Sequence, residues 1–411
     1  MHENSVSDKK MPNLRLIKGK LIQPANWFFI FIVSLFYLFA TSCINKREKA
    51  SQNLPDTNSV VSEINRYARG FSITKYGNFD MLEVKKPWQG SEQVNFKYLL
   101  VKEGEIVPDS IRKGADLIRM PIERIVCTST THVAMLDALG KTNAIVGVSG
   151  SDLITNKEIK ERIKLGEIRD IGYGRELNYE VLVSLRPDVV LIYGVESEMT
   201  GLIHKLKDLG ISVLMNGEYL EEDPLGKMEW IKLMATLFGL GEKATVLFDS
   251  VATRYELLKS KTESVNHRPV VLTGLPWKDV WYVSPGNTAN AKFIEAAGAT
   301  YLWEDLESEK AIPMDLESVY LKAGNSEYWI NTGTARSIDQ IVSMDSRFSY
   351  FPPVSSGKVY NNIARVNATG GNDYWESGLM HPDIILRDLI SIFHPELLGE
   401  QALVYYQKLQ P

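Results

Sequence analysis

A long amphipathic helix is predicted at residues 241–265, GEKATVLFDSVATRYELLKSKTESV. Its apolar side chains recur at steps of three and four and form one face: Ala244, Leu247, Val251, Tyr255 and Leu258. At ~1.5 Å per residue this helix would be roughly 35 Å long, enough to cross a domain. Similar strand-and-helix patterns lie on both sides, in residues 123–222 and 268–380. The pattern indicates either two lobes joined by this helix, with a ligand between them, or one larger α/β domain with an ordinary core helix.

The first 43 residues have the pattern of a signal peptide. Lysines and arginines between residues 9 and 20 precede the apolar run Trp27–Ala40, and Thr41-Ser42-Cys43 follows. The run is short for a transmembrane helix and suits a signal-peptide core. Small residues before a cysteine resemble a bacterial lipobox, which implies lipidation of Cys43; the alternative is a short anchor that stays uncleaved. Both place the mature chain outside the cytoplasm, periplasmic or extracytoplasmic, against a membrane, with the polar residues 44–65 as a flexible tether.

Composition argues against nucleic-acid binding and against an intramolecular disulfide. The net charge of −5 and the pI near 5.8 give no basic surface, so nucleic acid is not an expected partner. With Cys43 lipidated, Cys127 is the one cysteine that remains, so no intramolecular disulfide can form. Cys127 lies in the apolar stretch IVC and is expected to be buried.

The folded part divides into four predicted segments. Residues 66–119 alternate as β-strands, with a tight hairpin turn at Gly77-Asn78, and form an N-terminal β extension. Residues 120–224 alternate strands with helices, which predicts an α/β lobe with a mostly parallel sheet. Linker helices, the long helix included, occupy 225–266. A second α/β lobe follows in 267–411, with a tail helix expected at 396–408.

The two lobes contain a weak internal repeat. In the first, Glu180 opens a short helix, a turn follows at Pro187-Asp188, and a strand ends at Tyr193-Gly194. In the second, Glu317 opens the helix and the strand ends near Gly333. The two spacings differ by two or three residues, which is consistent with two lobes of one architecture.

These stretches resemble the substrate-binding proteins of bacterial iron-chelate and cobalamin importers of the ABC type. The resemblance covers roughly residues 120–400 and is carried by an ordered set of stretches: RIVCTSTTHVAMLDALGKTNAIVGVSG, LNYEVLVSLRPDVVLIYG, SPGNTANAKFIEAAGA, DLESVYL and NDYWESGLMHPDIILRDLISIFHPEL. It implies two Rossmann-like α/β lobes bridged by one long helix, the class III architecture of periplasmic binding proteins. It also implies an ABC permease with its ATPase as partners and a small-molecule metal chelate as ligand. The β extension lies outside the common pattern.

By position in the family motif, Glu180 and Glu317 correspond to the glutamates that dock onto arginines of the permease. A carboxylate in the first turn of a helix is stabilised by the helix dipole, and an exposed carboxylate pair matches an arginine pair. Purely local roles would explain each glutamate singly, but not their matched places in the repeat.

Ligand-binding residues are expected where strands lead into loops at the carboxyl ends of the sheets. Aromatic walls with a few polar groups would suit a large, ring-bearing ligand, and an arginine could pair with an anionic chelate. The main candidates are Thr131, His132, Tyr193, Trp281, Tyr282, Thr332, Arg365, Asn372, Tyr374 and Trp375. Further candidates in the same loops are Thr130, Ser151, Asp152, Glu196, Glu218, Tyr219, Trp277 and Thr334. Core packing is the alternative for each aromatic, and a helix-start role is the alternative for His132.

No enzyme motif is present in the sequence. It contains no Gly-x-Ser-x-Gly, His-Glu-x-x-His or P-loop pattern, and its six histidines show no paired zinc spacing. Neither a cofactor nor a resident metal is therefore expected. The predicted function is capture of an iron chelate, a siderophore or haem, for an ABC importer. Cobalamin binding and an α/β lipoprotein enzyme acting on a metal chelate are the alternatives.

Overall fold

The computed structural model describes residues 60–63, 65–194 and 199–411. The predicted signal peptide with Cys43, residues 44–59 of the predicted tether and the candidate Glu196 lie outside the described residues. Residues Val60–Glu63, which were expected in the tether, form strand β1. Within the described ranges, no helix combines the length and the apolarity needed to cross a membrane.

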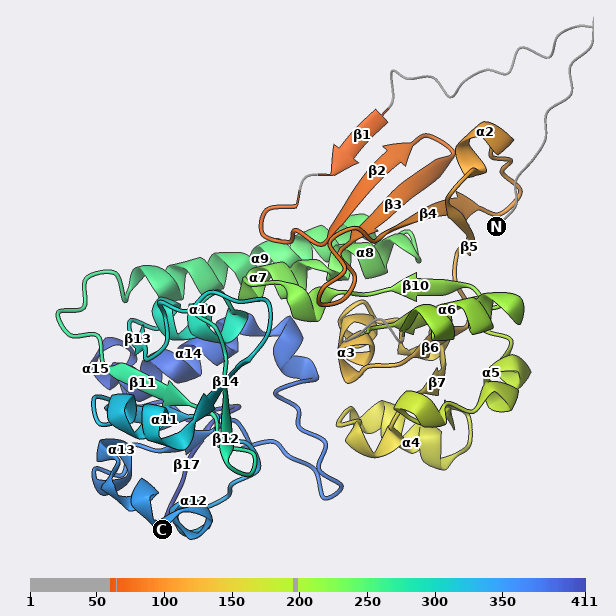
Figure 1. Ribbon diagram of the computed structural model, residues 1–411. Helices are drawn as coiled ribbons and strands as arrows, with labels where there is room; N and C mark the ends of the chain where they lie inside the picture. The colour runs from red at the N-terminus through yellow and green to blue at the C-terminus, as the bar shows by residue number, and fades with distance from the viewer. Residues whose placement is uncertain (1–59, 64, 195–198) are drawn as a thin grey trace, which may run out of the picture. The chain divides into compact units, whose positions relative to one another are not determined.

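The first lobe is a five-stranded parallel sheet in the order β10-β9-β6-β7-β8 (Figure 1). Its strands are β6 (Ile125–Cys127), β7 (Ile145–Val148), β8 (Arg169–Asp170), β9 (Val189–Ile192) and β10 (Val213–Met215). Four helices connect them: α3 (Thr130–Ala138), α4 (Lys157–Lys164), α5 (Tyr179–Leu185) and α6 (Met199–Asp208). Four of these strands were predicted from their apolar runs; β8 was missed because its two residues are polar and exposed. Cys127 is buried in β6, as expected, and burial raises the pKa of its thiol.

The second lobe has a smaller parallel sheet in the order β13-β11-β15, and a separate antiparallel pair of strands. The sheet strands are β11 (Val270–Thr273), β13 (Thr300–Tyr301) and β15 (Tyr328–Ile330), and the separate pair is β12 (Val280–Val283) with β14 (Ile312–Asp315). The helices are α10 (Ala289–Ala296), α11 (Leu316–Ala323), α12 (Ile338–Met344), α13 (Pro352–Ser355), α14 (Pro382–Phe393) and α15 (Pro395–Leu398).

The prediction of a tail helix at residues 396–408 is wrong. Helix α15 ends at Leu398, and the chain then pairs β17 (Gln407–Lys408) with β16 (Tyr360–Asn361). The buried carboxylate of Asp388 accepts hydrogen bonds from the backbone N–H groups of Val404, Tyr405 and Tyr406. These bonds are available only to an extended segment, because a helix uses its N–H groups internally.

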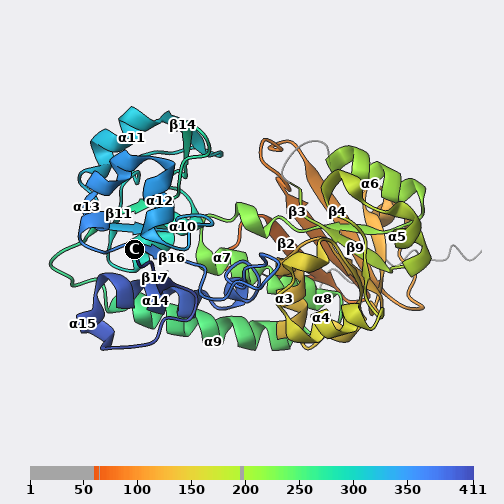
Figure 2. The same ribbon diagram turned by 90° about the horizontal axis from the view of Figure 1, so that it is seen from below.

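Three linker helices lie between the lobes: α7 (Pro224–Glu229), α8 (Ile231–Thr236) and α9 (Gly241–Ser260). Helix α9 is shorter than the predicted 241–265, and its 20 residues span roughly 30 Å. Near its start, Lys243 Nζ donates to the carbonyl of Leu139 in the first lobe, and further along Arg254 pairs with Asp383 of α14 at 2.6 Å. Figures 1 and 2 show α9 running from α8 to the side of α14, so the helix bridges the lobes as predicted.

The extension is a five-stranded sheet that is antiparallel except for its last pair. It contains β1, β2 (Phe71–Tyr76), β3 (Phe79–Lys85), β4 (Asn95–Lys102), the short helix α2 (Asp109–Arg112) and β5 (Asp116–Met120). The predicted hairpin at Gly77-Asn78 joins β2 to β3. Alternate residues face opposite ways: Tyr98 and Leu100 belong to the main core, whereas Phe79 and Leu99 form a small separate core. The hydroxyl of Tyr98 accepts a hydrogen bond from the backbone N–H of Met215 in β10, so the extension packs on the first lobe.

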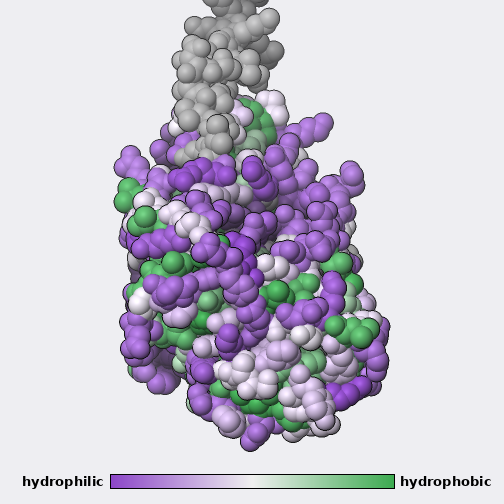
Figure 3. All heavy atoms as spheres, turned by 90° about the vertical axis from the view of Figure 1, so that its left-hand side faces the viewer, coloured by the Kyte–Doolittle hydropathy of each residue, from purple (hydrophilic) through white to green (hydrophobic). Residues whose placement is uncertain are grey.

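The α/β class with mostly parallel sheets in two bridged lobes is therefore confirmed. The surface of the side occupied by the second lobe is mainly hydrophilic, with hydrophobic side chains in small separate patches (Figure 3).

Candidate functional site

A cleft of about 1020 Å³ is lined by residues of both lobes, the linker and the extension. The first lobe contributes Thr131, Tyr193, Glu218 and Tyr219; the second contributes Asn290, Phe293, Tyr374 and Trp375; helix α7 contributes Lys227; and the extension contributes Arg69, Lys86 and Trp88, among others. This volume is at the upper end of the range of small-molecule sites and can hold a large ring-bearing molecule. The first lobe, the second lobe and the extension therefore all contact one space.

The first-lobe wall is a group of tyrosines beside a buried carboxylate. The rings of Tyr193 and Tyr219 meet edge to face at 6.4 Å, and the Tyr219 hydroxyl donates to the carbonyl of Gly194. The hydroxyls of Tyr193 and Tyr173 are 3.2 Å apart. Burial raises the pKa of Tyr219 to about 12, so its phenol is neutral at neutral pH. Tyr193 and Tyr219 line the cleft, each with an apolar ring and a hydroxyl that has a partner.

Glu218 is the least satisfied polar group of this wall. Its side chain is 3% exposed, and its Oε2 has no hydrogen-bond partner within the described part of the chain. Burial raises its pKa, which favours the neutral acid. The ammonium of Lys227, on the neighbouring helix α7, has its pKa lowered by burial. Both groups line the cleft, where a ligand with polar atoms would supply the missing partners.

The second-lobe wall is aromatic. Tyr374 and Trp375 stack edge to face with ring centroids 4.7 Å apart, and Tyr374 also contacts Tyr405 and Tyr406. Tyr374 is 6% exposed, whereas Trp375 is 59% exposed and presents its indole to the cleft. Both residues were predicted, as were Thr131 and Tyr193, and the structure brings these four together at one cleft.

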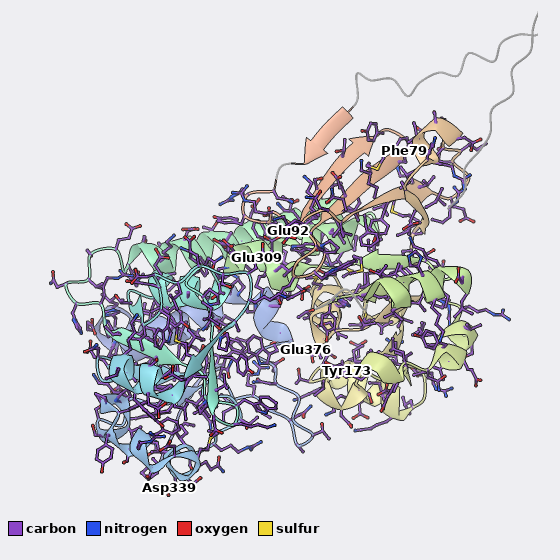
Figure 4. All side chains as sticks on the ribbon, viewed as in Figure 1. Phe79, Glu92, Tyr173, Glu309, Asp339 and Glu376 are labelled. Carbon is purple, nitrogen blue, oxygen red and sulfur yellow. The ribbon has the colours of Figure 1, made fainter. Side chains whose placement is uncertain are left out.

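Two predicted ligand residues belong instead to a loop that holds the lobes together. In this interlobe loop, residues 365–377, Arg365 pairs with Asp373 at 2.7 Å and Asn372 Nδ2 donates to the carbonyl of Asn362. The carboxylate of Glu376, labelled in Figure 4, accepts hydrogen bonds from the backbone N–H groups of Thr155 and Asn156 in the first lobe. The predicted roles of Arg365 and Asn372 do not match these positions, because neither residue lines the cleft and both side chains already have partners.

Four further predicted residues lie away from the cleft. Trp281 is fully buried, where its ring stacks on Trp329 at 5.9 Å and meets Phe348 edge to face. Thr332 and His132 are also fully buried, and Tyr282 is exposed on β12. Burial lowers the pKa of His132 to about 3, so its imidazole is neutral, and its nitrogens have no hydrogen-bond partner among the described residues. Loop-like sequence neighbours did not distinguish core aromatics from cleft aromatics.

The remaining candidates are divided. Thr130, Glu218 and Tyr219 line the cleft, whereas Ser151 and Asp152 do not. The backbone carbonyl of Asp152 accepts hydrogen bonds from Asn367 and Thr369 of the interlobe loop. Trp277 is exposed, with Lys278 over its ring, and Thr334 is also exposed. The cleft residues that the sequence did not indicate include those of the extension, those of α7, and Asn290 and Phe293 of α10. A strand pattern says which residues face together, but not which surface they face.

The two predicted docking glutamates each lie in the first turn of an exposed helix. In α5, Asn178 caps the helix and Glu180 is exposed, with the exposed apolar residue Val183 one turn further on. In α11, Asp315 caps the helix and Glu317 is followed by Leu321, which is 83% exposed. Glu317 differs in making an exposed ion pair with Arg347 at 3.5 Å. Such pairs contribute little to stability and can exchange partners.

The described residues contain no group of three histidine, cysteine or acidic side chains arranged to hold a metal ion. The side chains that line the cleft offer aromatic contact, hydrogen bonding and charge.

Known proteins match this chain over most of its length. Two uncharacterized lipoproteins of Methanocaldococcus jannaschii are each 25% identical, one over 390 residues, covering 89% of this chain and 90% of the relative, and the other over 401 residues, covering 93% and 98%. These alignments extend well beyond the two lobes.

Solved structures share the fold at low sequence identity. A possible iron-binding periplasmic solute-binding protein from Staphylococcus epidermidis is 18% identical, with a TM-score of 0.53, covering 67% of this chain and 100% of that chain. A periplasmic haem-binding protein from Pseudomonas aeruginosa is 17% identical, with a TM-score of 0.53, covering 71% and 99%. These proteins are covered almost completely, so about a third of this chain has no counterpart in them.

The family model described as periplasmic binding protein matches residues 125–362, from the first strand of the first lobe to the end of β16 in the second. The match includes both sheets, the bridging helix and most of the cleft. This chain belongs to the periplasmic binding protein family.

Proposed function

We propose that this chain is an extracytoplasmic lipoprotein that captures an iron chelate, a siderophore or haem, and delivers it to an ABC permease. The observation that carries the proposal is a cleft of about 1020 Å³ between two bridged lobes, lined by Tyr193, Tyr219, Tyr374 and Trp375. Such a surface complements a large, partly apolar ring system. Similar solved proteins are named for iron or haem binding, and the two archaeal relatives are named lipoproteins. Lipidation at Cys43 would tether the protein beside its permease.

In the same proposal, Glu180 and Glu317 contact arginines of the permease. Each carboxylate lies at the start of an exposed helix and is followed by an exposed apolar side chain, Val183 or Leu321. An exposed apolar side chain with a charged residue beside it matches the apolar core and polar rim of protein interfaces. Glu317 would exchange Arg347 for an arginine of the permease. Import would use ATP hydrolysed by the partner ATPase, so this chain would perform no chemistry.

Titration of intrinsic tryptophan fluorescence tests the ligand assignment. Trp375 is exposed at the cleft, so a bound haem or ferric chelate should quench its emission. We expect saturable quenching by haem or by a ferric siderophore, and weaker or no response to cobalamin. Saturable binding of cobalamin alone would replace the iron-chelate assignment with the cobalamin alternative. A chelate chemically altered during incubation would instead support the enzyme alternative.

Two tryptophan variants separate cleft residues from core residues. Trp375→Ala should weaken binding of the quenching ligand by about tenfold, because an exposed aromatic contact is lost. Trp281→Phe should leave the dissociation constant unchanged and lower the free energy of unfolding by about 1–2 kcal/mol, because the smaller ring leaves a gap beside Trp329. Isothermal titration calorimetry and urea unfolding measure the two effects. Weaker binding by Trp281→Phe with Trp375→Ala unaffected would instead place the ligand beside Trp281 and Trp329, outside this cleft.

A further inference from the structure

The first segment of the extension, residues 66–70, is bound to the linker region by hydrogen bonds. The backbone N–H groups of Arg66, Tyr67 and Ala68 donate to the carboxylate of Glu229 at 3.0, 2.8 and 2.9 Å. Those of Arg69 and Gly70 donate to Glu221 at 2.9 Å each. Glu229 is fully buried and Glu221 is 7% exposed, so both bind the segment away from water. Charge-assisted bonds of this kind are among the stronger ones in proteins.

Close packing holds the same segment in place. A Cβ built on Gly70 would lie 2.8 Å from Trp230 Cζ2, so only glycine lets the backbone rest on that indole. The ring of Phe71 lies 4.8 Å from Trp230, and the Trp230 Nε1 donates to Glu221. The position of the extension is therefore set by buried contacts on both sides of Gly70.

The turn between β3 and β4 of the extension reaches both lobes. On the first lobe, a Cβ built on Gly217 would lie 3.6 Å from the carbonyl oxygen of Pro87. On the second lobe, Glu92 lies beside Glu309, as Figure 4 shows. Lys86, in the same turn, has a φ of 46°, an uncommon conformation for a side-chain-bearing residue. This turn and the first segment line the same cleft as Trp375 of the interlobe loop.

The charges that the extension brings to the cleft are mostly positive. Arg69, Lys85 and Lys86 line it together with Lys227 of α7, and no hydrogen bond or ion pair engages their side-chain nitrogens within the described residues. The acidic residues nearby are more fully engaged: Glu221 accepts from the extension backbone, Glu222 accepts from Asn287, and Asp223 caps α7. Glu218 is buried without a partner at Oε2 among the described residues, and Glu92 and Glu309 line the cleft as exposed carboxylates. On the extension itself, the cations Arg69, Lys85 and Lys86 outnumber the carboxylate Glu92.

We propose that the extension is a third wall of the cleft and that Arg69 and Lys86, together with Lys227 of α7, bind anionic oxygens of the ligand. The chemical class is a chelate that carries carboxylates or other negative oxygens. The inference rests on the proposed function in that the solute occupies this cleft. It goes further in assigning the extension, which has no role in the two-lobed architecture, to ligand selection. Cations on a fixed wall give both attraction and orientation to an anionic group.

Matched pairs of probes test the inference. One pair is haem and haem dimethyl ester, which differ only in the free carboxylates; the other is an anionic ferric tricarboxylate chelate and a neutral ferric trihydroxamate chelate. Wild-type protein should bind the anionic member of a pair more tightly. Arg69→Gln with Lys86→Gln should weaken binding of the anionic member by at least about tenfold, the loss expected for one charge-assisted bond. Binding of the neutral member should change by no more than about twofold, because distant charges are screened by salt.

Lys102→Gln with Lys113→Gln is the matched control, since it removes two exposed cations from the extension outside the cleft. It should bind every probe as the wild type does. The inference is overturned if the wild type prefers the neutral members, or if Arg69→Gln with Lys86→Gln binds the anionic members unchanged, and in both cases the solute-binding function stands. If the wild type binds no chelate at all, the proposed function fails and the inference fails with it. Circular dichroism of each variant establishes that the fold is retained.

Discussion

Replacing Glu229 with alanine is expected to lower the free energy of unfolding by about 3–5 kcal/mol, the cost of breaking a buried, charged hydrogen-bond group. The carboxylate is fully buried and holds three backbone N–H groups of the extension together with Lys232 Nζ at 2.7 Å. Its removal leaves these donors without a partner in a dry environment. Urea unfolding followed by circular dichroism measures the loss.

Glu263→Ala is the control, because Glu263 is exposed and its side chain has no partner within the described residues. This change should alter stability by no more than about 0.5 kcal/mol. A loss below about 1 kcal/mol for Glu229→Ala would mean that the first segment of the extension is held by its apolar contacts with Trp230 rather than by the carboxylate.

The contribution of Glu229 should also depend on pH. Burial by itself raises the pKa of this carboxyl, but bonds from Lys232 and from the backbone N–H groups of residues 66–68 outweigh it, and the folded-state pKa is lowered. A group with a lowered folded-state pKa stabilises the protein above its unfolded pKa of about 4.3. That stability is lost as the pH falls through the folded-state value. The difference between wild type and Glu229→Gln should therefore be full at neutral pH and shrink below pH about 4.

Reversing both predicted docking charges, Glu180→Arg with Glu317→Arg, is expected to reduce uptake through the partner permease to background while leaving ligand affinity intact. Two attractive contacts would become repulsive, and like charges at an interface cost several kcal/mol. Both residues lie outside the cleft, so the ligand should be held as before. Uptake of a radiolabelled or fluorescent chelate in cells that express the permease gives the first readout, and calorimetric titration of the purified protein gives the second.

The matched control is Glu242→Arg with Asp339→Arg. These acidic residues also lie exposed in the first turns of helices, α9 and α12, and Figure 4 shows Asp339 away from the cleft. The control therefore has the same change in net charge and in helix-dipole interaction, and uptake should persist. Equal loss of uptake in both double variants would point to a general charge effect, and loss of affinity in Glu180→Arg with Glu317→Arg would contradict the docking assignment.

The bridging helix shows what periodicity can determine. Ala244, Val251 and Tyr255, three of the predicted apolar residues, are buried, so the apolar stripe was read correctly. The helix ends at Ser260, five residues earlier than predicted, because the chain turns there: Thr262 donates its hydroxyl to Ala296 and is buried against the second lobe. The end of the helix thus depends on the contact between Thr262 and Ala296, which are distant in the sequence, and local periodicity cannot predict such a contact.

The candidate site was predicted in part for a similar reason. Thr131, Tyr193, Tyr374 and Trp375 follow strands or begin helices at the cleft, where the rule for parallel sheets places ligand residues. Trp281 met the same local criteria and is nevertheless buried between Trp329 and Phe348. An aromatic residue near glycine and proline can lie in a cleft or in a core, and only the packing around it distinguishes the two.

The sequence by itself determined the α/β class, the two lobes, the bridging helix and the family resemblance, because strand and helix periodicity and ordered motifs are local properties of the chain. The tertiary structure alone decided that the extension borders the cleft. That arrangement depends on Glu221 and Glu229, which bind backbone N–H groups more than 150 residues away. Every residue except proline has a backbone N–H group, so the sequence does not indicate which of these groups a distant carboxylate will bind. No sequence pattern could therefore predict that residues 66–70 contact Glu221 and Glu229. The cations Arg69 and Lys86 reach the cleft through that connection.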